Sequence, residues 1–223
     1  MKICIPIVAK CRLEAEKLIR RAQPGADLLE IWLDNLNQAD VLPLISTLKK
    51  PVIAVCRGKE ERGSYMGTEE TRVGILCEAV RSGSKYVDIG LQTASDLIKR
   101  IKKVAKKEGA QLIISKHFWD STPDLDELIE ISKKAKHLGA DIVKVAAQVN
   151  KWSDNVLLFE FTKRLASRDK MIVIGMGERG QISRIGCPLL GSFLTYVALD
   201  EKNKTASGQF TLGEFEKMLY FVR

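Results

Sequence analysis

The feature that most constrains the fold of this chain is a pattern that occurs eight times along its 223 residues. Each occurrence is a short run of mostly apolar residues, followed by a longer amphipathic stretch. Runs such as VIAVC at 52–56 and IVKVA at 142–146 are almost wholly apolar, as are strands that are buried on both faces of a parallel sheet. The pattern therefore predicts eight buried strands, over Lys2–Val8, Asp27–Trp32, Pro51–Cys56, Tyr86–Ile89, Gln111–Ser115, Asp141–Val145, Lys170–Ile174 and Ser192–Val197.

The amphipathic stretches between these runs predict helices. In Leu125–His137, leucines and isoleucines recur at helical spacing, with lysines on the opposite side. The preceding Ser121–Pro123 is typical of an N-terminal cap followed by proline, and Gly139 is typical of a helix end. Two further helices are expected over Thr68–Ser82, which begins with acidic residues as the helix dipole favours, and over Thr211–Phe221.

Eight strand-then-helix units without a linker favour the α/β class and a closed (β/α)8 TIM barrel. An open, doubly wound sheet is the alternative architecture. A content of 45% hydrophobic and 29% charged residues suits a globular chain with a substantial core. We expect a single domain over residues 1–223, because no low-complexity segment or linker marks a boundary.

Composition also narrows the cellular setting. No apolar run approaches the roughly 18 residues that cross a bilayer, so no membrane association is expected. The first residues form a short β-branched run, which we expect to be a strand and not a signal peptide. The five cysteines are scattered and form no C-x-x-C pair, which disfavours both a disulfide framework and a zinc site. We therefore expect a cytoplasmic protein.

The net charge of +8 is spread over many segments. Lysines and arginines lie where exposed helix faces are expected, and only 6% of the residues are aromatic. This distribution disfavours nucleic-acid binding and favours a solvated surface, with a few arginines available for a small anionic substrate.

Candidate functional residues follow from the architecture, because the active site of such a barrel lies at the C-terminal ends of its strands. Glu30 is expected after the second strand, His117 after the fifth and Met176 after the seventh, whereas Lys144 is expected within the sixth. The other candidates at this end are Asp34, Arg57, Glu61 and Arg184.

Lys144 is the least ordinary of these residues, since it interrupts an apolar strand. Burial disfavours an uncompensated charge, so such a lysine keeps a neutral amine that can form an imine with a ketone. The structural alternative is a lysine on an edge strand that extends its charge to water. A closed barrel has no edge strand, and the eightfold pattern therefore favours the nucleophile.

His117 is one of only two histidines. The other, His137, lies at an expected helix C-terminus, where the helix dipole explains it. An imidazole at the mouth of the barrel is a natural proton carrier, although a purely structural role is the alternative. Adjacent strands would bring His117 and Lys144 to the same mouth.

The segment Gly175–Gly180 matches G-x-G-x-x-G, which can indicate a dinucleotide site. It occurs in the seventh unit, where too little chain remains for the βαβαβ arrangement that such a site needs. A tight turn between strand and helix explains these glycines better.

Several short motifs extend over most of the chain, namely LEIWLD at 29–34, CRGKEE at 56–61, SKHF at 115–118, DIVKVA at 141–146, ISR at 182–184 and ASGQ at 206–209. In their order and spacing they resemble the type I 3-dehydroquinate dehydratase family, which forms a Schiff base in the shikimate pathway. The separation of 27 residues between His117 and Lys144 (144 − 117) also fits this family.

The resemblance implies a set of catalytic roles. Lys144 corresponds to the imine-forming lysine, and His117 corresponds to the general acid and base. Glu61 corresponds to the carboxylate that assists this histidine. No metal and no organic cofactor are implied.

The resemblance also implies a binding site for 3-dehydroquinate, a small anionic substrate. Arg184 would grip the carboxylate, for which a planar bidentate donor is well suited. Thr205 and Gln209 would belong to a loop that closes over the substrate. Glu30 and Arg57 would bind ring hydroxyls, and Met176 would form an apolar wall. The resemblance further implies a homodimer.

Three positions depart from the family pattern. Trp32 stands where arginine is usual, Gly90 stands where the fourth strand often has an acid, and Ser207, directly before Gly208, stands where proline is common. The change at Trp32 bears on one hydroxyl contact and leaves the imine chemistry untouched.

Two other functions remain open at this stage. A class I aldolase-like barrel would share the lysine imine but cleave a carbon–carbon bond, and a basic binding protein would form no ketone adduct. Together, Arg184 and Gln209 favour a carboxylate substrate over a sugar phosphate.

Overall fold

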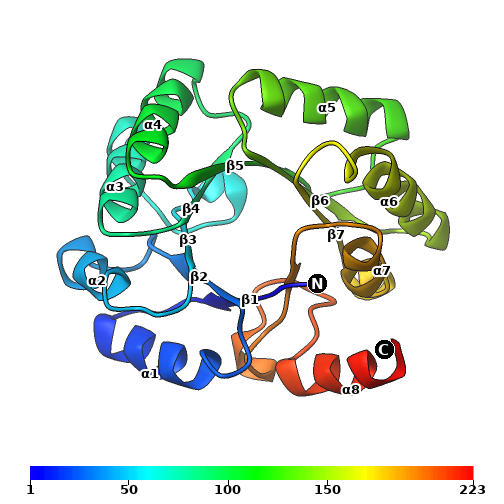
Figure 1. Cartoon of the computed structure of the whole chain (residues 1–223), viewed down its shortest axis with the longest axis horizontal. Helices are drawn as coiled ribbons and strands as arrows, with labels where there is room; N and C mark the ends of the chain where they lie inside the picture. The colour runs from blue at the N-terminus through cyan, green and yellow to red at the C-terminus, as the bar shows by residue number, and fades with distance from the viewer. Residues whose placement is uncertain (223) are drawn as a thin grey trace.

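The computed structural model describes residues 1–222, apart from the side chains at 38, 39, 221 and 222. Eight parallel strands form a barrel with helices around it, which confirms the predicted fold class (Figure 1). The strands are β1 (Ile3–Ile7), β2 (Leu28–Trp32), β3 (Val52–Val55), β4 (Tyr86–Gly90), β5 (Gln111–Phe118), β6 (Ile142–Gln148), β7 (Met171–Met176) and β8 (Thr195–Tyr196).

The eight strands pair in the order β7-β6-β5-β4-β3-β2-β1-β8. At the seam between β7 and β8, the Phe193 N–H donates to the carbonyl oxygen of Met171 at 2.7 Å. Strand β8 is much shorter than the predicted Ser192–Val197. At Ser192, the side-chain hydroxyl and not the backbone contacts β7, since it accepts from the Val173 N–H. Ser192 is therefore not part of strand β8.

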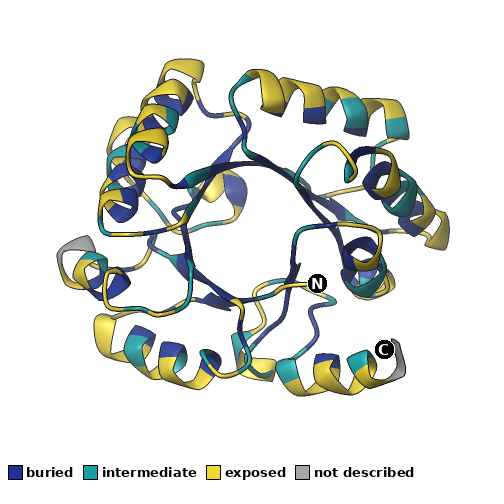
Figure 2. Cartoon of the chain, in the orientation of Figure 1, coloured by how far each residue is buried: buried dark blue, intermediate teal, exposed yellow. Residues whose placement is uncertain are grey.

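Helices form the outer ring, with their exposed faces directed away from the barrel (Figure 2). None of the helices in the described residues is long and apolar enough to cross a membrane. The helices are α1 (Arg12–Ala22), α2 (Gln38–Ile45), α3 (Glu69–Arg81), α4 (Ser95–Lys107), α5 (Leu125–His137), α6 (Trp152–Leu165), α7 (Ser183–Leu189) and α8 (Leu212–Val222), and the 3-10 turns are η1 (Lys59–Glu61), η2 (Glu178–Gly180) and η3 (Glu201–Asn203).

Helix α5 has the predicted bounds, but its N-terminal cap was predicted wrongly. The Asp124 side chain accepts from the Glu127 N–H at 2.9 Å and so caps the helix. The hydroxyl of Thr122, within the predicted cap, instead donates to the Gln148 carbonyl oxygen at 2.8 Å. A tertiary contact to β6 therefore takes the group that the local sequence assigned to the helix.

Strand ends also differ from the prediction at functional positions. His117 lies inside β5 and Met176 is the last residue of β7, whereas both were expected after their strands. Glu30 lies inside β2, within the predicted range Asp27–Trp32. Strands β5 and β6 are the longest in the barrel, and they pair with Ser115 beside Lys144. The pairing of β5 with β6 continues through His117 and Phe118 at their C-terminal ends, so His117 lies on a strand and not in a loop.

The interior of the barrel is layered because strand side chains alternate between its two faces. Inward residues near the strand starts form an apolar layer that includes Leu28 and Ile142. Two positions further along, Glu30 and Lys144 continue the same inward rows, so a polar layer lies directly above the apolar one.

Candidate active site

The amine of Lys144 lies in the middle of the polar layer and is almost completely buried. Its Nζ lies 2.8 Å from Asp88 Oδ2, 3.3 Å from Glu30 Oε2 and 2.9 Å from Tyr196 Oη. The sequence predicted an amine kept neutral by uncompensated burial. In the structure, the carboxylates of Asp88 and Glu30 lie beside this amine and offset the cost of burying its charge.

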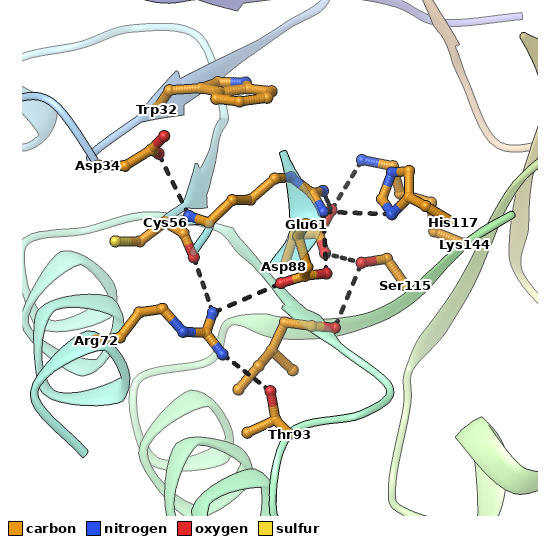
Figure 3. A network of polar contacts seen from close by, with 12 residues as sticks. Trp32, Asp34, Cys56, Glu61, Arg72, Asp88, Thr93, Ser115, His117 and Lys144 are labelled. Carbon is orange, nitrogen blue, oxygen red and sulfur yellow. Dashed lines mark hydrogen bonds and ion pairs between the residues drawn. The ribbon is translucent and has the colours of Figure 1, made fainter. Parts of the chain in front are cut away.

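Asp88 organises this layer from β4. Its Oδ1 accepts from the Ser115 hydroxyl at 2.6 Å, and its Oδ2 accepts from both Lys144 and Arg57 (Figure 3). Burial alone would raise the pKa of Asp88, but the neighbouring Lys144 and Arg57 outweigh burial and hold this pKa well below its usual range. The carboxylate is therefore a permanent negative charge beneath the reacting lysine.

His117 lies close to the guanidinium of Arg57, with Nδ1 3.4 Å from Arg57 Nη1. Arginine can only donate, so Nδ1 must accept and the ring proton of the neutral imidazole belongs on Nε2. Burial, together with the charges of Arg57 and Lys144, lowers the pKa of His117 well below 6.5. Trp119 stacks on the ring with a centroid distance of 4.9 Å. These contacts hold a neutral imidazole, which is the form that can accept a proton.

Glu61 approaches the histidine through Arg57. Its Oε1 lies 3.3 Å from Arg57 Nη1, the nitrogen that also faces His117. Burial raises the pKa of Glu61 despite this cation. The other terminal nitrogen of Arg57 donates to Asp88, so both nitrogens already have partners inside the protein. In this arrangement Arg57 links the two carboxylates to the imidazole.

Arg184, from α7, is a buried guanidinium with little compensation. Its Nη2 donates to the Ser207 carbonyl oxygen at 3.3 Å, and its Nε is buried without a hydrogen-bond partner. Within the described residues, no carboxylate lies within ion-pair distance of this side chain. Burial lowers the pKa of Arg184 to about 10. A buried cation of this kind is suited to an anionic ligand.

The segment 205–209 covers the same region. Gln209 Oε1 accepts from the Thr205 N–H at 2.8 Å and from its hydroxyl at 3.2 Å, so the loop closes on itself. The Gln209 Nε2 is buried and without a partner, which leaves a second free donor beside Arg184 in the cavity wall. Gly208 has a φ of +72°, and a Cβ at this position would overlap the Gly177 carbonyl oxygen. Glycine lets the loop pack onto the end of β7.

A cavity of about 390 Å³ joins these parts. Nine of the ten candidates that were proposed from the sequence line it, namely Glu30, Arg57, Glu61, His117, Lys144, Met176, Arg184, Thr205 and Gln209. The tenth, Asp34, does not line the cavity, because its carboxylate accepts from the backbone N–H groups of Arg57 and Ser64 in the loop after β3. The sequence analysis missed Arg62, Trp119 and Tyr196, which also line the cavity. Trp119 and Arg62 follow recognised motifs closely enough to have been candidates, whereas nothing local distinguishes Tyr196 from a core tyrosine.

The glycines of 175–180 are explained by packing at the end of β7. A Cβ at Gly175 would lie 2.7 Å from Ser183 Oγ, and one at Gly180 would lie 2.5 Å from the Gly175 carbonyl carbon. Gly177 has a φ of +82°. The close turn therefore requires small residues whether or not a ligand binds.

The profile of the type I 3-dehydroquinase family matches residues 3–223. The chain belongs to the type I 3-dehydroquinase family. This confirms the resemblance that the short motifs indicated.

Relatives of this family are similar along nearly all of the chain. The 3-dehydroquinate dehydratase of Desulfotalea psychrophila is 34% identical over 85% of this chain and 84% of its own length. The 3-dehydroquinate dehydratase of Methanothermobacter thermautotrophicus is 32% identical over 98% of this chain and 96% of its own length. A crystal structure of the type I enzyme from Clostridium difficile with covalently modified comenic acid superposes with a TM-score of 0.89, at 25% identity over 99% of this chain and 91% of that one.

Two departures from the type I 3-dehydroquinase pattern have visible consequences. The Trp32 Nε1–H donates to Glu30 Oε1 at 2.9 Å, and the guanidinium of Arg57 lies 5.7 Å from the centre of its ring system. Trp32 therefore orients Glu30 through a neutral hydrogen bond, whereas an arginine at this position would add a positive charge to the site. At Gly90, a Cβ would lie 2.6 Å from Glu61 Oε1, so Glu61 occupies the space that a side chain on β4 would need.

Proposed function

We propose that this chain converts 3-dehydroquinate to 3-dehydroshikimate in the shikimate pathway, through an imine on Lys144. Membership of the type I 3-dehydroquinase family supports the reaction. The observation that carries the assignment of residues is the shared cavity, which contains a buried lysine and the buried Arg184, a cation without an ion-pair partner among the described residues. A ketone that also bears a carboxylate matches both groups.

The reaction begins when the neutral amine of Lys144 attacks the ketone carbon and water is lost. The protonated imine then draws electrons from the adjacent C–H bond, and His117 takes the proton. The electron pair expels the hydroxyl group at the next carbon, which receives a proton from His117 and leaves as water. Hydrolysis of the unsaturated imine releases the product and restores Lys144.

The remaining residues position the substrate. Arg184 holds the carboxylate, and Glu30 and Arg57 hold ring hydroxyls. Thr205 and Gln209 carry the loop that excludes water.

The neighbouring residues support the cavity itself. Met176 forms an apolar wall, and Glu61 acts on His117 through Arg57.

The test is reductive trapping with 3-dehydroquinate and borohydride, followed by intact mass measurement and peptide mapping. Wild-type protein should carry one adduct, on Lys144, and Lys144→Ala should carry none and lose turnover. Lys116→Ala is the matched control. Lys116 follows Ser115, the residue of β5 that pairs with Lys144, and its side chain points out of the barrel because side chains alternate between the two faces of a strand. Normal turnover by Lys144→Ala would contradict the proposal, and an adduct only with aldol substrates would favour the aldolase alternative.

We also propose that the protein works in the cytoplasm as a homodimer. All five cysteines are free thiols, which suits a reducing compartment. The dimer rests on the family resemblance alone. Sedimentation equilibrium gives the mass in solution, and a monomeric mass over the working concentration range would contradict it.

A further inference from the structure

Tyr196 on β8 has no role in the mechanism above, yet its hydroxyl contacts the reacting nitrogen. Oη lies 2.9 Å from Lys144 Nζ and 2.6 Å from Glu30 Oε2. The side chain is 5% exposed and lines the cavity. It therefore lies between the amine and a carboxylate, at a place that substrate can reach.

The direction of the two hydrogen bonds follows from their partners. A carboxylate can only accept, so the single phenolic proton of Tyr196 points to Glu30. The phenol oxygen then offers a lone pair to the Lys144 N–H. The result is a directed chain from nitrogen through the phenol to Glu30.

We infer that Tyr196 is a further catalytic residue, which carries a proton from the Lys144 ammonium to Glu30 before attack and returns it when water leaves. This inference rests on the proposed function. In the first step, an N–H proton moves to Oη while the phenolic proton moves to Glu30 Oε2. The amine becomes neutral, Glu30 becomes a carboxylic acid and Tyr196 remains a phenol.

The same proton completes imine formation. The amine forms a C–N bond as the C=O π bond breaks, and the oxygen takes a proton from nitrogen to give a neutral carbinolamine. Glu30 then returns its proton through Tyr196 to the hydroxyl group, the C–O bond breaks and water leaves. An ammonium and a ketone have become a protonated imine and water, with Glu30 again a carboxylate, so protons and electrons balance.

The surroundings of Tyr196 keep it in the phenol form that this transfer needs. The titratable and charged groups that face it are Glu30 on β2, Arg57 after β3, Asp88 on β4, Lys144 on β6 and Cys4 on β1. Burial and the negative charge of Glu30 raise the pKa of Tyr196 well above 10. Burial and the neighbouring carboxylates therefore oppose loss of its proton to solvent.

Tyr196→Phe tests the inference, since it keeps the ring against the lysine and removes only the hydroxyl. The rate of imine formation should be measured by rapid mixing with 3-dehydroquinate and borohydride quench over a range of pH. We expect the rate of imine formation near pH 7 to fall at least about tenfold, with little change in KM. A tenfold fall corresponds to an increase of about 1.4 kcal/mol in the activation free energy. The deficit should shrink as pH rises, because hydroxide then removes the proton from the amine directly.

Tyr86→Phe is the matched control, because Tyr86 begins β4 at the opposite end of the barrel and packs against Phe193. This variant should form imine at the wild-type rate, and thermal unfolding should show that both variants are folded. An unchanged rate and pH profile in Tyr196→Phe would overturn the inference. Absence of trapping in the wild-type protein would instead overturn the proposed function.

Discussion

At the scale of single residues, the site depends on which buried charges are paired. Lys144 and Asp88 balance each other, and Arg57 is balanced by Asp88 and Glu61. Arg184 lacks such a partner within the described part of the chain. Burying an unpaired charge costs several kcal/mol, so this residue lowers stability in return for anion binding.

The lowered pKa of His117 gives a prediction for pH dependence. The imidazole stays neutral below 6.5, so kcat should not fall with a midpoint near 6.5 as pH decreases. Below pH 6.5, His117 binds a proton in the unfolded chain but not in the folded protein. The stability of the native protein should therefore decrease as pH falls from 6.5 toward the lowered pKa of His117 in the folded state.

Two measurements check this prediction. A pH–rate profile between roughly pH 5 and 8 gives the midpoint, and urea unfolding of wild type and His117→Asn over the same range gives the stability. The asparagine variant should lose less stability on acidification. A kcat profile with its midpoint near 6.5 would show instead that the histidine is solvated and ordinary.

At the scale of elements, two strands and one loop bring the chemistry together. Strands β5 and β6 carry His117 and Lys144 on adjacent inward rows, and the loop at 205–209 returns from the far end of the chain to cover them. The loop contacts the end of β7, where Gly177 N–H donates to the Ser207 carbonyl oxygen. Its position therefore depends on close packing between two backbones.

Gly208→Ala should disturb this packing. The positive φ and the overlap with Gly177 together should cost about 1–3 kcal/mol of local strain, which the loop relieves by moving away from the cavity. We expect a higher KM and a lower kcat, with trapping on Lys144 retained. Gly213→Ala in α8 is the control, because a Cβ there meets nothing within 4 Å and helix propensity favours alanine by up to about 1 kcal/mol. Steady-state kinetics with wild-type values for Gly208→Ala would show that the loop does not need this backbone conformation.

At the scale of the whole molecule, the barrel separates its interior from solvent almost completely. Cys4, Cys56, Cys77 and Cys187 are buried, whereas Cys11 is exposed just before α1. Burial raises the pKa of Cys56 and of Cys187 to about 12. These thiols are therefore both inaccessible and protonated in the native fold.

Thiol titration should report this separation. Native protein treated with a thiol-reactive chromophore at pH 8 should release one equivalent rapidly, and the urea-unfolded chain should release all five. Cys11→Ser should remove the fast phase and leave activity unchanged. A second fast equivalent in the native protein would mean that the barrel opens on the timescale of the reaction.

The amino-acid sequence by itself determined the barrel, the helix over Leu125–His137 and the set of nine residues that line the cavity, because apolar periodicity and motif spacing are local properties. The same information did not locate the ends of β5 and β8, the cap at Asp124 or the inward position of Tyr196. It also did not reveal that Asp88 and Glu30 compensate the charge of Lys144, or that Arg57 joins Glu61 to His117. The contacts of Lys144 with Asp88 and Glu30, and that of Arg57 with His117, join residues more than 50 positions apart, as does the pair of Glu30 and Tyr196 at a separation of 166. Only closure of the barrel brings such residues within a few ångströms, where burial strengthens their interaction, so the tertiary structure decides which charges are paired and where protons can move.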